Sequence, residues 1–311
     1  MHGPGSAPLT VEEVGKIVAY TMARQPSLNC VMLDCQNPLG DELDAFLYSI
    51  HGDLLTLPDH TRYQIVYRLL DHWSVIDISI MEHCAEFFLL DAANSLPSIL
   101  ACVKTIRACF PEATIRYAGL SIQYDKDNCA VFALDHAFSV AEIFDLHSLL
   151  PSYELKEDEL LGDLPDLPDH VALFLKDNEA LASSSLSLFE AQLLAKSIRY
   201  LPTIRFAKAY PALLIHTQSM SFLSRHADLD LEFAPGRTLT SHLETHIGKA
   251  LEFSAPEHYQ NHSVLHRLQE LRILIAPKAK IASPQSSVVV YKSLFTPSPE
   301  VAITRPYRSS L

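Results

Sequence analysis

Residues 72–77 read His-Trp-Ser-Val-Ile-Asp, residues 89–94 read Leu-Leu-Asp-Ala-Ala-Asn, and residues 123–132 read Gln-Tyr-Asp-Lys-Asp-Asn-Cys-Ala-Val-Phe. These three segments supply, in this order, a histidine, an acid, a side-chain amide and a thiol. A cysteine nucleophile needs a base within hydrogen-bond reach and a third group that orients the base. The segments therefore favour acyl-transfer chemistry through a cysteine.

Four residues are the candidate catalytic groups: His72 as base, Asp91 as orienting acid, Gln123 as oxyanion donor and Cys129 as nucleophile. Taken singly, each has a commoner explanation, such as a buried core thiol for Cys129 or a cap for Asp91. A polar turn precedes Cys129 and an apolar helical pattern follows it. The thiol is thus expected at a helix N-terminus, where unpaired N–H groups and the helix dipole favour a thiolate.

Hydrophobic patterning along the chain predicts an α+β fold, with a core of helices and strands in mixed order. A capping box of Thr10 and Glu13 predicts a helix that ends near Arg24. Met81 to Cys84 is expected to form a hairpin turn. Strands are predicted at 29–34, 62–68, 73–80, 86–90 and 115–122, and helices at 41–57, 96–110, 129–146, 180–200, 212–226 and 256–275.

Composition limits the function further. The 311-residue chain carries a formal net charge of −13, which argues against non-specific binding to nucleic acid or to an anionic membrane. No apolar run approaches the roughly 20 residues that span a bilayer, and no secretory signal peptide is visible. Six cysteines without paired spacing indicate a reduced protein. Residues 154–179 hold nine acids and two lysines, as a solvated loop would.

The order histidine, acid, glutamine, cysteine, with the glutamine six residues before the cysteine, resembles a clan of cysteine peptidases that process ubiquitin-like proteins. Within that clan, the amino-acid sequences of the segments at 72–77, 90–94 and 122–133 are similar to the catalytic blocks of the YopJ family of bacterial effector acetyltransferases. A further block supports the resemblance, with Tyr200-Leu-Pro202 followed by Phe206, Lys208 and His216-Thr-Gln218. The resemblance extends over about residues 10–275.

The resemblance implies a secreted effector that acts in the host cytoplasm. It would transfer acetyl groups from acetyl-CoA to Ser, Thr or Lys of host signalling or immune proteins, through an acetyl-Cys129 thioester. Inositol hexakisphosphate would activate it. The implied architecture is a cysteine-protease-like mixed sheet flanked by helices at 9–150, an acidic loop at 151–179, a helical regulatory module at 180–280 and a flexible tail at 281–311.

Phosphate-rich ligands need clustered basic side chains. For acetyl-CoA, the candidates on and near the helix after the acid are Lys104, Arg107 and Arg116. For inositol hexakisphosphate, they are Arg62, Arg205, Lys208, Arg225, His262, His266, Arg267 and Arg272. Histidines recur at helical spacing at 258, 262 and 266, but no metal site is expected, because no cysteine or glutamate with metalloenzyme spacing accompanies them.

Three positions depart from the family pattern. Asp91 replaces the commoner glutamate, Ala130 stands where glycine usually follows the cysteine, and Ile215 precedes the His-Thr-Gln block where the family often has a lysine. Two other functions stay open, the first because the same triad attacks thioesters and isopeptides, the second because of the departures at Asp91 and Ala130. One is a cysteine protease that removes ubiquitin or a ubiquitin-like modifier, and the other is a degenerate effector that binds host proteins without turnover.

Overall fold

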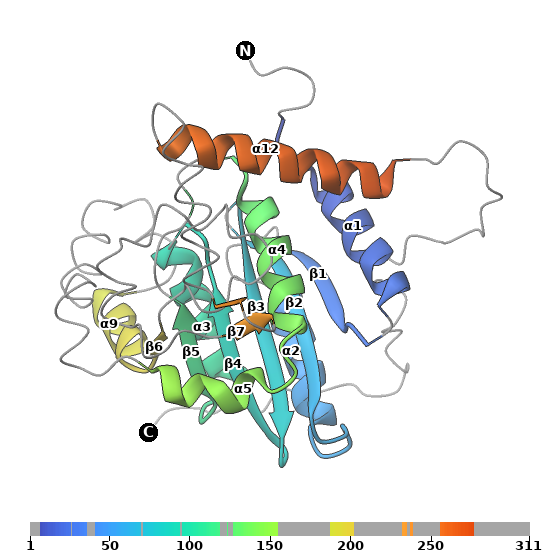
Figure 1. The fold of residues 1–311 in the computed structure, drawn as a ribbon. Coiled ribbons are helices and arrows are strands. Elements are labelled where there is room, and N and C mark those ends of the chain that lie inside the picture. Colours follow the sequence, from blue (N-terminus) through green and yellow to red (C-terminus); the bar gives the residue numbers. More distant parts are fainter. Residues whose placement is uncertain are drawn as a thin grey trace, which may run out of the picture. The chain divides into compact units, whose positions relative to one another are not determined.

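Six strands form one mixed sheet in the computed structural model, in the order β1-β2-β3-β4-β5-β6 (Figure 1). Strands β2, β3 and β4 pair antiparallel, whereas β1 pairs parallel with β2, and β4, β5 and β6 pair parallel with one another. The strand bounds are β1 Cys30–Cys35, β2 Thr61–Leu69, β3 His72–Met81, β4 Cys84–Leu90, β5 Thr114–Ala118 and β6 Arg199–Leu201. A separate two-stranded sheet pairs β7 (Glu232–Ala234) with β8 (Arg237–Thr238).

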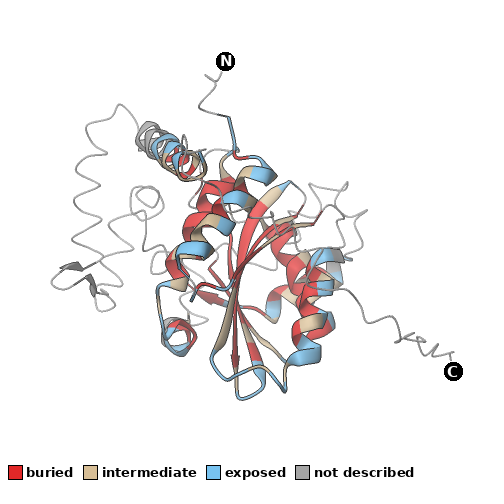
Figure 2. Cartoon of the chain, turned by 90° about the vertical axis from the view of Figure 1, so that its right-hand side faces the viewer, coloured by how far each residue is buried: buried red, intermediate tan, exposed pale blue. Residues whose placement is uncertain are grey.

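Helices cover both faces of the six-stranded sheet (Figures 1 and 2). One face packs against α2 (Asp41–Asp53), α3 (Leu96–Cys109) and α9 (Leu188–Lys196). The other packs against α1 (Val11–Arg24), α4 (Cys129–Ala141) and α5 (Leu146–Leu149), and the 3₁₀-helix η1 spans Leu150–Tyr153. Helix α12 (Pro256–Ile275) packs on α1 and α4 (Figure 1).

The structure describes residues 7–25, 27–35, 41–69, 71–93, 95–118, 123, 127–154, 187–201, 232–234, 237–238 and 256–276. These residues all belong to the unit Met1–Ala276, which is distinct from Pro277–Leu311.

The central strands are buried on both faces, so apolar residues occupy both alternating sets of positions. On β3, Ile76 and Ile78 belong to the core on the α2–α3 side, whereas Val75 belongs to the core on the α4 side. On β4, Phe87 and Phe88 divide in the same way. The α4 side of the sheet also carries buried polar residues, and these are described below.

The predicted α+β fold class is confirmed by the mixed sheet and its flanking helices. The capping box of α1 is present, because the Thr10 hydroxyl accepts from Glu13 N and the Glu13 carboxylate accepts from Thr10 N. The hairpin between β3 and β4 is also present. Its two turn residues, Glu82 and His83, both have positive φ, as two-residue turns that match the strand twist require.

Several expected bounds were wrong. The helix predicted at 41–57 ends at Asp53, and the helix predicted at 180–200 ends at Lys196 because Arg199–Leu201 pairs with β5 as strand β6. The strand predicted at 115–122 is described only as far as Ala118. The predicted helix at 212–226, most of the acidic loop and the tail at 281–311 lie outside the described residues.

Elements from the predicted regulatory part join the same sheet and core as the catalytic part. Strand β6 extends the six-stranded sheet, and Leu268 and Leu271 of α12 belong to the core that contains Cys129.

All six cysteines are free thiols. In the described part of the chain, no helix is both long and apolar enough to cross a membrane.

Candidate active site

Three of the four candidate residues lie at element ends that meet at one edge of the sheet. His72 is the first residue of β3, Asp91 follows the last residue of β4, and Cys129 is the first residue of α4. Because β3 and β4 are antiparallel, with Val75 opposite Leu90, the start of β3 lies beside the end of β4. The sheet topology thus brings His72 and Asp91 together.

The carboxylate of Asp91 is fully buried and accepts hydrogen bonds from several groups. Its Oδ2 lies 2.8 Å from Nε2 of His72 and accepts a hydrogen bond of 2.8 Å from the Ser74 hydroxyl. Its Oδ1 accepts a hydrogen bond of 2.9 Å from the backbone N–H of Ala93. Burial alone would raise the pKa of Asp91, but the hydrogen bonds from His72 and Ser74 outweigh it and hold that pKa below its ordinary value.

His72 connects this carboxylate to the thiol of Cys129. Burial lowers the pKa of His72, but hydrogen bonds with Asp91 and Cys129 oppose it and raise that pKa to about 10. The imidazole is therefore oriented by its acid and is protonated at neutral pH beside the sulfur.

Cys129 lies in the first turn of α4 and is only 6% exposed. Its place at the positive end of the helix dipole agrees with the sequence-based expectation. The next residue, Ala130, is also buried. The backbone of the nearby Asn128 begins the helical ladder by accepting from Val131 N.

Gln123 is placed at the same edge by its main chain. Its backbone N–H donates a 2.8 Å hydrogen bond to the carbonyl of Ala92, the residue after Asp91, and its side chain is buried. Gln123 is thereby tied to the residue that follows the acid. An oxyanion role for Gln123 stays a prediction.

Two arginines that were predicted to bind ligands form ion pairs with carboxylates of the protein. The side chain of Arg116 is 4% exposed and forms ion pairs with Glu86 at 3.0 Å and Glu154 at 2.8 Å. Arg62 forms a bidentate ion pair with Asp77. Both guanidinium groups are paired with carboxylates of the sheet and its neighbouring segments, which argues against the predicted contacts of Arg116 with acetyl-CoA and of Arg62 with inositol hexakisphosphate.

The other two candidates for acetyl-CoA lie on α3. Arg107 donates to the backbone carbonyls of Pro111, Ala113 and Ser197, and so ties the end of α3 to the segment before β6. This use argues against a coenzyme contact. Lys104 is more accessible, with 40% of its side chain exposed, and pairs with Glu190 of α9 at 3.1 Å.

The described inositol-phosphate candidates on α12 also have acidic neighbours. Arg267 pairs with Asp135 and Glu270, and Arg272 pairs with Glu13. His266 is 57% exposed and lies 3.4 Å from Glu270. His262 belongs to α12, but its side chain lies outside the described part, as do the residues Arg205, Lys208 and Arg225.

The residue patterns alone did not identify several buried polar groups near the site. Ser74 donates to the acid, and its place two residues after His72 in an alternating strand was the available signal. His136 on α4 is fully buried, and burial lowers its pKa to about 4, so it is neutral. Within the described residues, neither ring nitrogen of His136 has a hydrogen-bond partner. No group of three potential metal ligands occurs among the described residues.

The arrangement of acid, imidazole and thiol agrees with the sequence resemblance, and a family comparison decides the assignment. The family model described as YopJ serine/threonine acetyltransferase matches residues 3–272. The chain belongs to the YopJ acetyltransferase family. A search of curated proteins found no match.

Two solved structures are similar to this YopJ-family chain. AvrA delL154 with IP6 and CoA has 14% sequence identity and a TM-score of 0.45, over 84% of this chain and 87% of AvrA. HopZ1a in complex with IP6 has 11% identity and a TM-score of 0.44, over 84% of this chain and 85% of HopZ1a.

Proposed function

We propose that this YopJ-family acetyltransferase transfers acetyl groups to Ser, Thr or Lys side chains of proteins through a thioester on Cys129. The observation that carries the proposal is the continuous contact from Asp91 through His72 to Cys129. It contains a nucleophile, a base and an orienting acid in the order that covalent acyl transfer needs.

In the first half-reaction, His72 already holds the proton of the Cys129 thiol, and the sulfur attacks the thioester carbonyl of acetyl-CoA. The new C–S bond gives a tetrahedral oxyanion, for which the backbone N–H of Cys129 and the Gln123 side chain are the proposed donors. The bond to the sulfur of CoA then breaks, and His72 returns the proton to that leaving thiolate. Asp91 holds the ring and stabilises the imidazolium throughout.

In the second half-reaction, an acceptor hydroxyl or amine attacks the acetyl-Cys129 carbonyl. Acetylation removes the charge on the sulfur, and with it the Cys129 interaction that helps to raise the pKa of His72. The histidine is therefore a better proton donor once the thioester forms, and its neutral form is the base for the acceptor. Breaking the C–S bond then restores the thiol.

Family membership leads us to propose acetyl-CoA as donor and inositol hexakisphosphate as activator. IP6 is named with both solved structures and CoA with AvrA delL154. Among the described candidates, Lys104 and His266 have the most accessible side chains, with 40% and 57% exposed. We also propose that the protein is a secreted effector that acts on host signalling or immune proteins in the host cytoplasm.

A paired labelling experiment tests the reaction class against a protease. Purified protein is incubated with inositol hexakisphosphate and either acetyl-CoA or ubiquitin-like probes that carry a thiol-reactive C-terminus. The proposal predicts release of one CoA thiol per enzyme in a burst and no labelling of Cys129 by the probes. Probe labelling without CoA release would replace acetyl transfer by cleavage of a ubiquitin-like modifier.

A further inference from the structure

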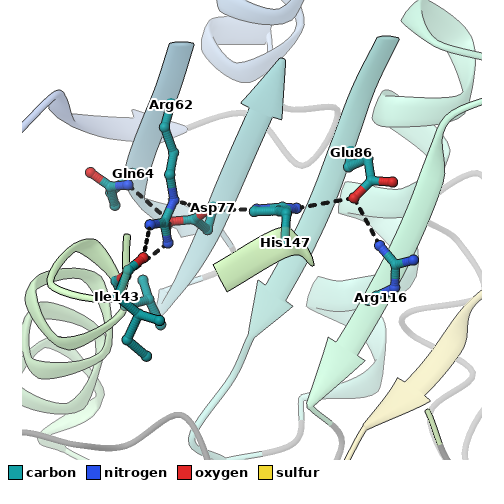
Figure 3. Close-up of polar contacts among 8 residues, drawn as sticks. Arg62, Gln64, Asp77, Glu86, Arg116, Ile143 and His147 are labelled. Atoms are coloured by element: carbon teal, nitrogen blue, oxygen red, sulfur yellow. Dashed lines mark hydrogen bonds and ion pairs between the residues drawn. The ribbon is translucent and has the colours of Figure 1, made fainter. Parts of the chain in front are cut away.

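A buried polar network lies on the α4 side of the sheet, away from the triad. It runs from Arg62 through Asp77, His147 and Glu86 to Arg116, so positive and negative groups alternate (Figure 3). The contributing strands are β2, β3, β4 and β5, and His147 comes from α5. The triad chemistry uses none of these groups.

Arg62 holds the C-terminal end of the helix that carries Cys129. Its guanidinium donates to the carbonyl oxygens of Val140 at 2.8 Å and Ile143 at 2.6 Å (Figure 3). The last carbonyls of a helix have no partner within the helix, and a cation there also complements the helix dipole. Arg62 therefore anchors α4 by directional hydrogen bonds.

Asp77 fixes Arg62 to the sheet. Its fully buried carboxylate accepts two hydrogen bonds from Arg62, at 2.8 and 2.9 Å, and one from Gln64 at 2.9 Å. The Nε2 atom of His147 lies 2.7 Å from the same carboxylate. Burial raises the pKa of Asp77, but His147 and Arg62 outweigh it, and the pKa of this carboxylate is lowered overall.

His147 closes the arrangement from the other side. Its Nδ1 lies 3.5 Å from Glu86, so each ring nitrogen faces a carboxylate. Burial lowers the pKa of His147, but these two contacts raise it above its ordinary value. His147 thus joins the segment after α4 to β3 through its contact with Asp77, and its other ring nitrogen faces Glu86 of β4.

The distance along β3 from His72 to Asp77 is similar to the length of α4. His72 and Asp77 are five residues apart, which is roughly 17 Å along a strand. The 13 residues of α4 span about 20 Å. Strand β3 thus holds α4 at both ends, through the His72–Cys129 contact at the N-terminus and through Asp77 and Arg62 at the C-terminus.

The face of α4 in this core combines small side chains with Val131, Leu134 and Val140. Alanines at positions 130, 133, 137 and 141 recur at helical spacing and belong to, or pack against, the core on this face. Apolar burial is not directional. Directional polar contacts at the C-terminus therefore add to this packing in fixing the register of the helix.

We propose that Arg62, Gln64, Asp77 and His147 form a clamp that positions helix α4, and through it the sulfur of Cys129 relative to His72. These four are positioning residues, because they do not touch the reacting atoms. The inference rests on the proposed acetyl transfer for its kinetic readout. It assigns to the last residue of the His72–Asp77 motif a role separate from that of the triad.

The test compares Arg62→Lys and Arg62→Met with Glu154→Gln, which perturbs the far end of the same network without contacting α4. The rate of acetyl-Cys129 formation is measured by quenched-flow mass spectrometry against acetyl-CoA concentration, with inositol hexakisphosphate present and well below each variant's Tm. Lysine keeps a charge beside Asp77 but has a single ammonium in place of the planar fork, so it cannot reproduce all four hydrogen bonds of Arg62.

The clamp predicts that both Arg62 variants lower the maximal rate by about 10-fold to 100-fold, the effect of a displacement near 1 Å. The half-saturating acetyl-CoA concentration should change by less than about twofold, because donor binding is intact. Glu154→Gln should lower Tm and leave the maximal rate unchanged. A folded Arg62→Lys protein with the wild-type maximal rate would overturn the clamp, even if Arg62→Met does not fold.

Alkylation of Cys129 by iodoacetamide, followed by peptide mapping, separates this inference from the proposed reaction. If the wild type forms no acetyl-enzyme, the proposed function fails, but the alkylation rate still reports the His72–Cys129 geometry. The clamp then predicts a change of about tenfold in Arg62→Lys and none in Glu154→Gln. Equal alkylation rates in all three proteins would contradict it.

Discussion

Asp135 of α4 and Arg267 of α12 form an ion pair, with 2.8 Å between the carboxylate and the guanidinium and 132 positions between them in the sequence. The pair connects the helix that begins with Cys129 to a helix from the C-terminal part of the chain. Asp135 is fully buried, so the cost of its charge bears directly on stability.

Asp135 makes stability depend on pH. Burial raises its pKa from 3.8 to about 6, although Arg267 partly opposes the shift. Between pH 4 and 6 the folded protein binds this proton more tightly than the unfolded chain does. The contribution of Asp135 to the free energy of unfolding therefore falls as pH rises through that window and is constant above it. Relative to wild type, Asp135→Asn should gain about 3 kcal/mol in unfolding free energy from pH 4 to pH 7.

Urea unfolding of wild type and Asp135→Asn at several pH values measures this difference directly, because the other carboxylates are common to both proteins. The stability of the variant relative to wild type should rise between pH 4 and 6 and then level off. A difference that is flat across the whole range would show that Asp135 titrates as in the unfolded chain.

Asp91→Asn should weaken the base without removing it. The carboxylate is a main cause of the raised His72 pKa, so that pKa should fall from about 10 towards 6.5. Loss of the oriented imidazolium should slow CoA release by about 10³-fold to 10⁴-fold. Burst kinetics and NMR titration of the His72 ring measure the two effects.

The neighbouring acid Asp71 provides a matched control. It directly precedes His72, has 87% of its side chain exposed and pairs with Arg68. Asp71→Asn should therefore leave both the burst rate and the His72 titration as in wild type. An equal fall in burst rate for Asp71→Asn and Asp91→Asn would mean that any negative charge near His72 supports the reaction, and that the buried hydrogen bond from Asp91 is not needed.

Ser74→Ala removes one of the hydrogen bonds to Asp91. Leaving a buried carboxylate short of a donor should cost about 1–3 kcal/mol of stability. His72 and the Ala93 N–H still hold Asp91, so the burst rate should fall by only about tenfold. Chemical denaturation and burst kinetics test both effects, with Ser79→Ala on the same strand as the control.

Much of the fold followed from local pattern. The capping box of Thr10 and Glu13, and the strands around His72 and Asp91, were predictable because their signals lie within a few residues. Strand β6 was missed, since a three-residue edge strand carries almost no periodicity and is set by pairing with β5. The sequence also gave no sign of where α12 would pack.

The proximity of Asp91, His72 and Cys129 was predictable because their order along the chain is specific, whereas the partners of the basic residues were not. Arg62 and Arg116 looked like phosphate ligands in a sequence where their partners Asp77, Glu86 and Glu154 are distant. Tertiary contacts decide which basic side chains pair with carboxylates inside the protein and which remain accessible to a ligand. A sequence can place a charge on a strand but does not show which carboxylate faces it.

The central claim is that Cys129 carries the acetyl group, and intact mass measures it most directly. Wild type and Cys129→Ala are incubated with acetyl-CoA and inositol hexakisphosphate, quenched in acid and weighed before and after hydroxylamine treatment. The account predicts a gain of about 42 Da on wild type alone, removed by hydroxylamine as a thioester is. The same gain on Cys129→Ala, or none on wild type, would contradict it.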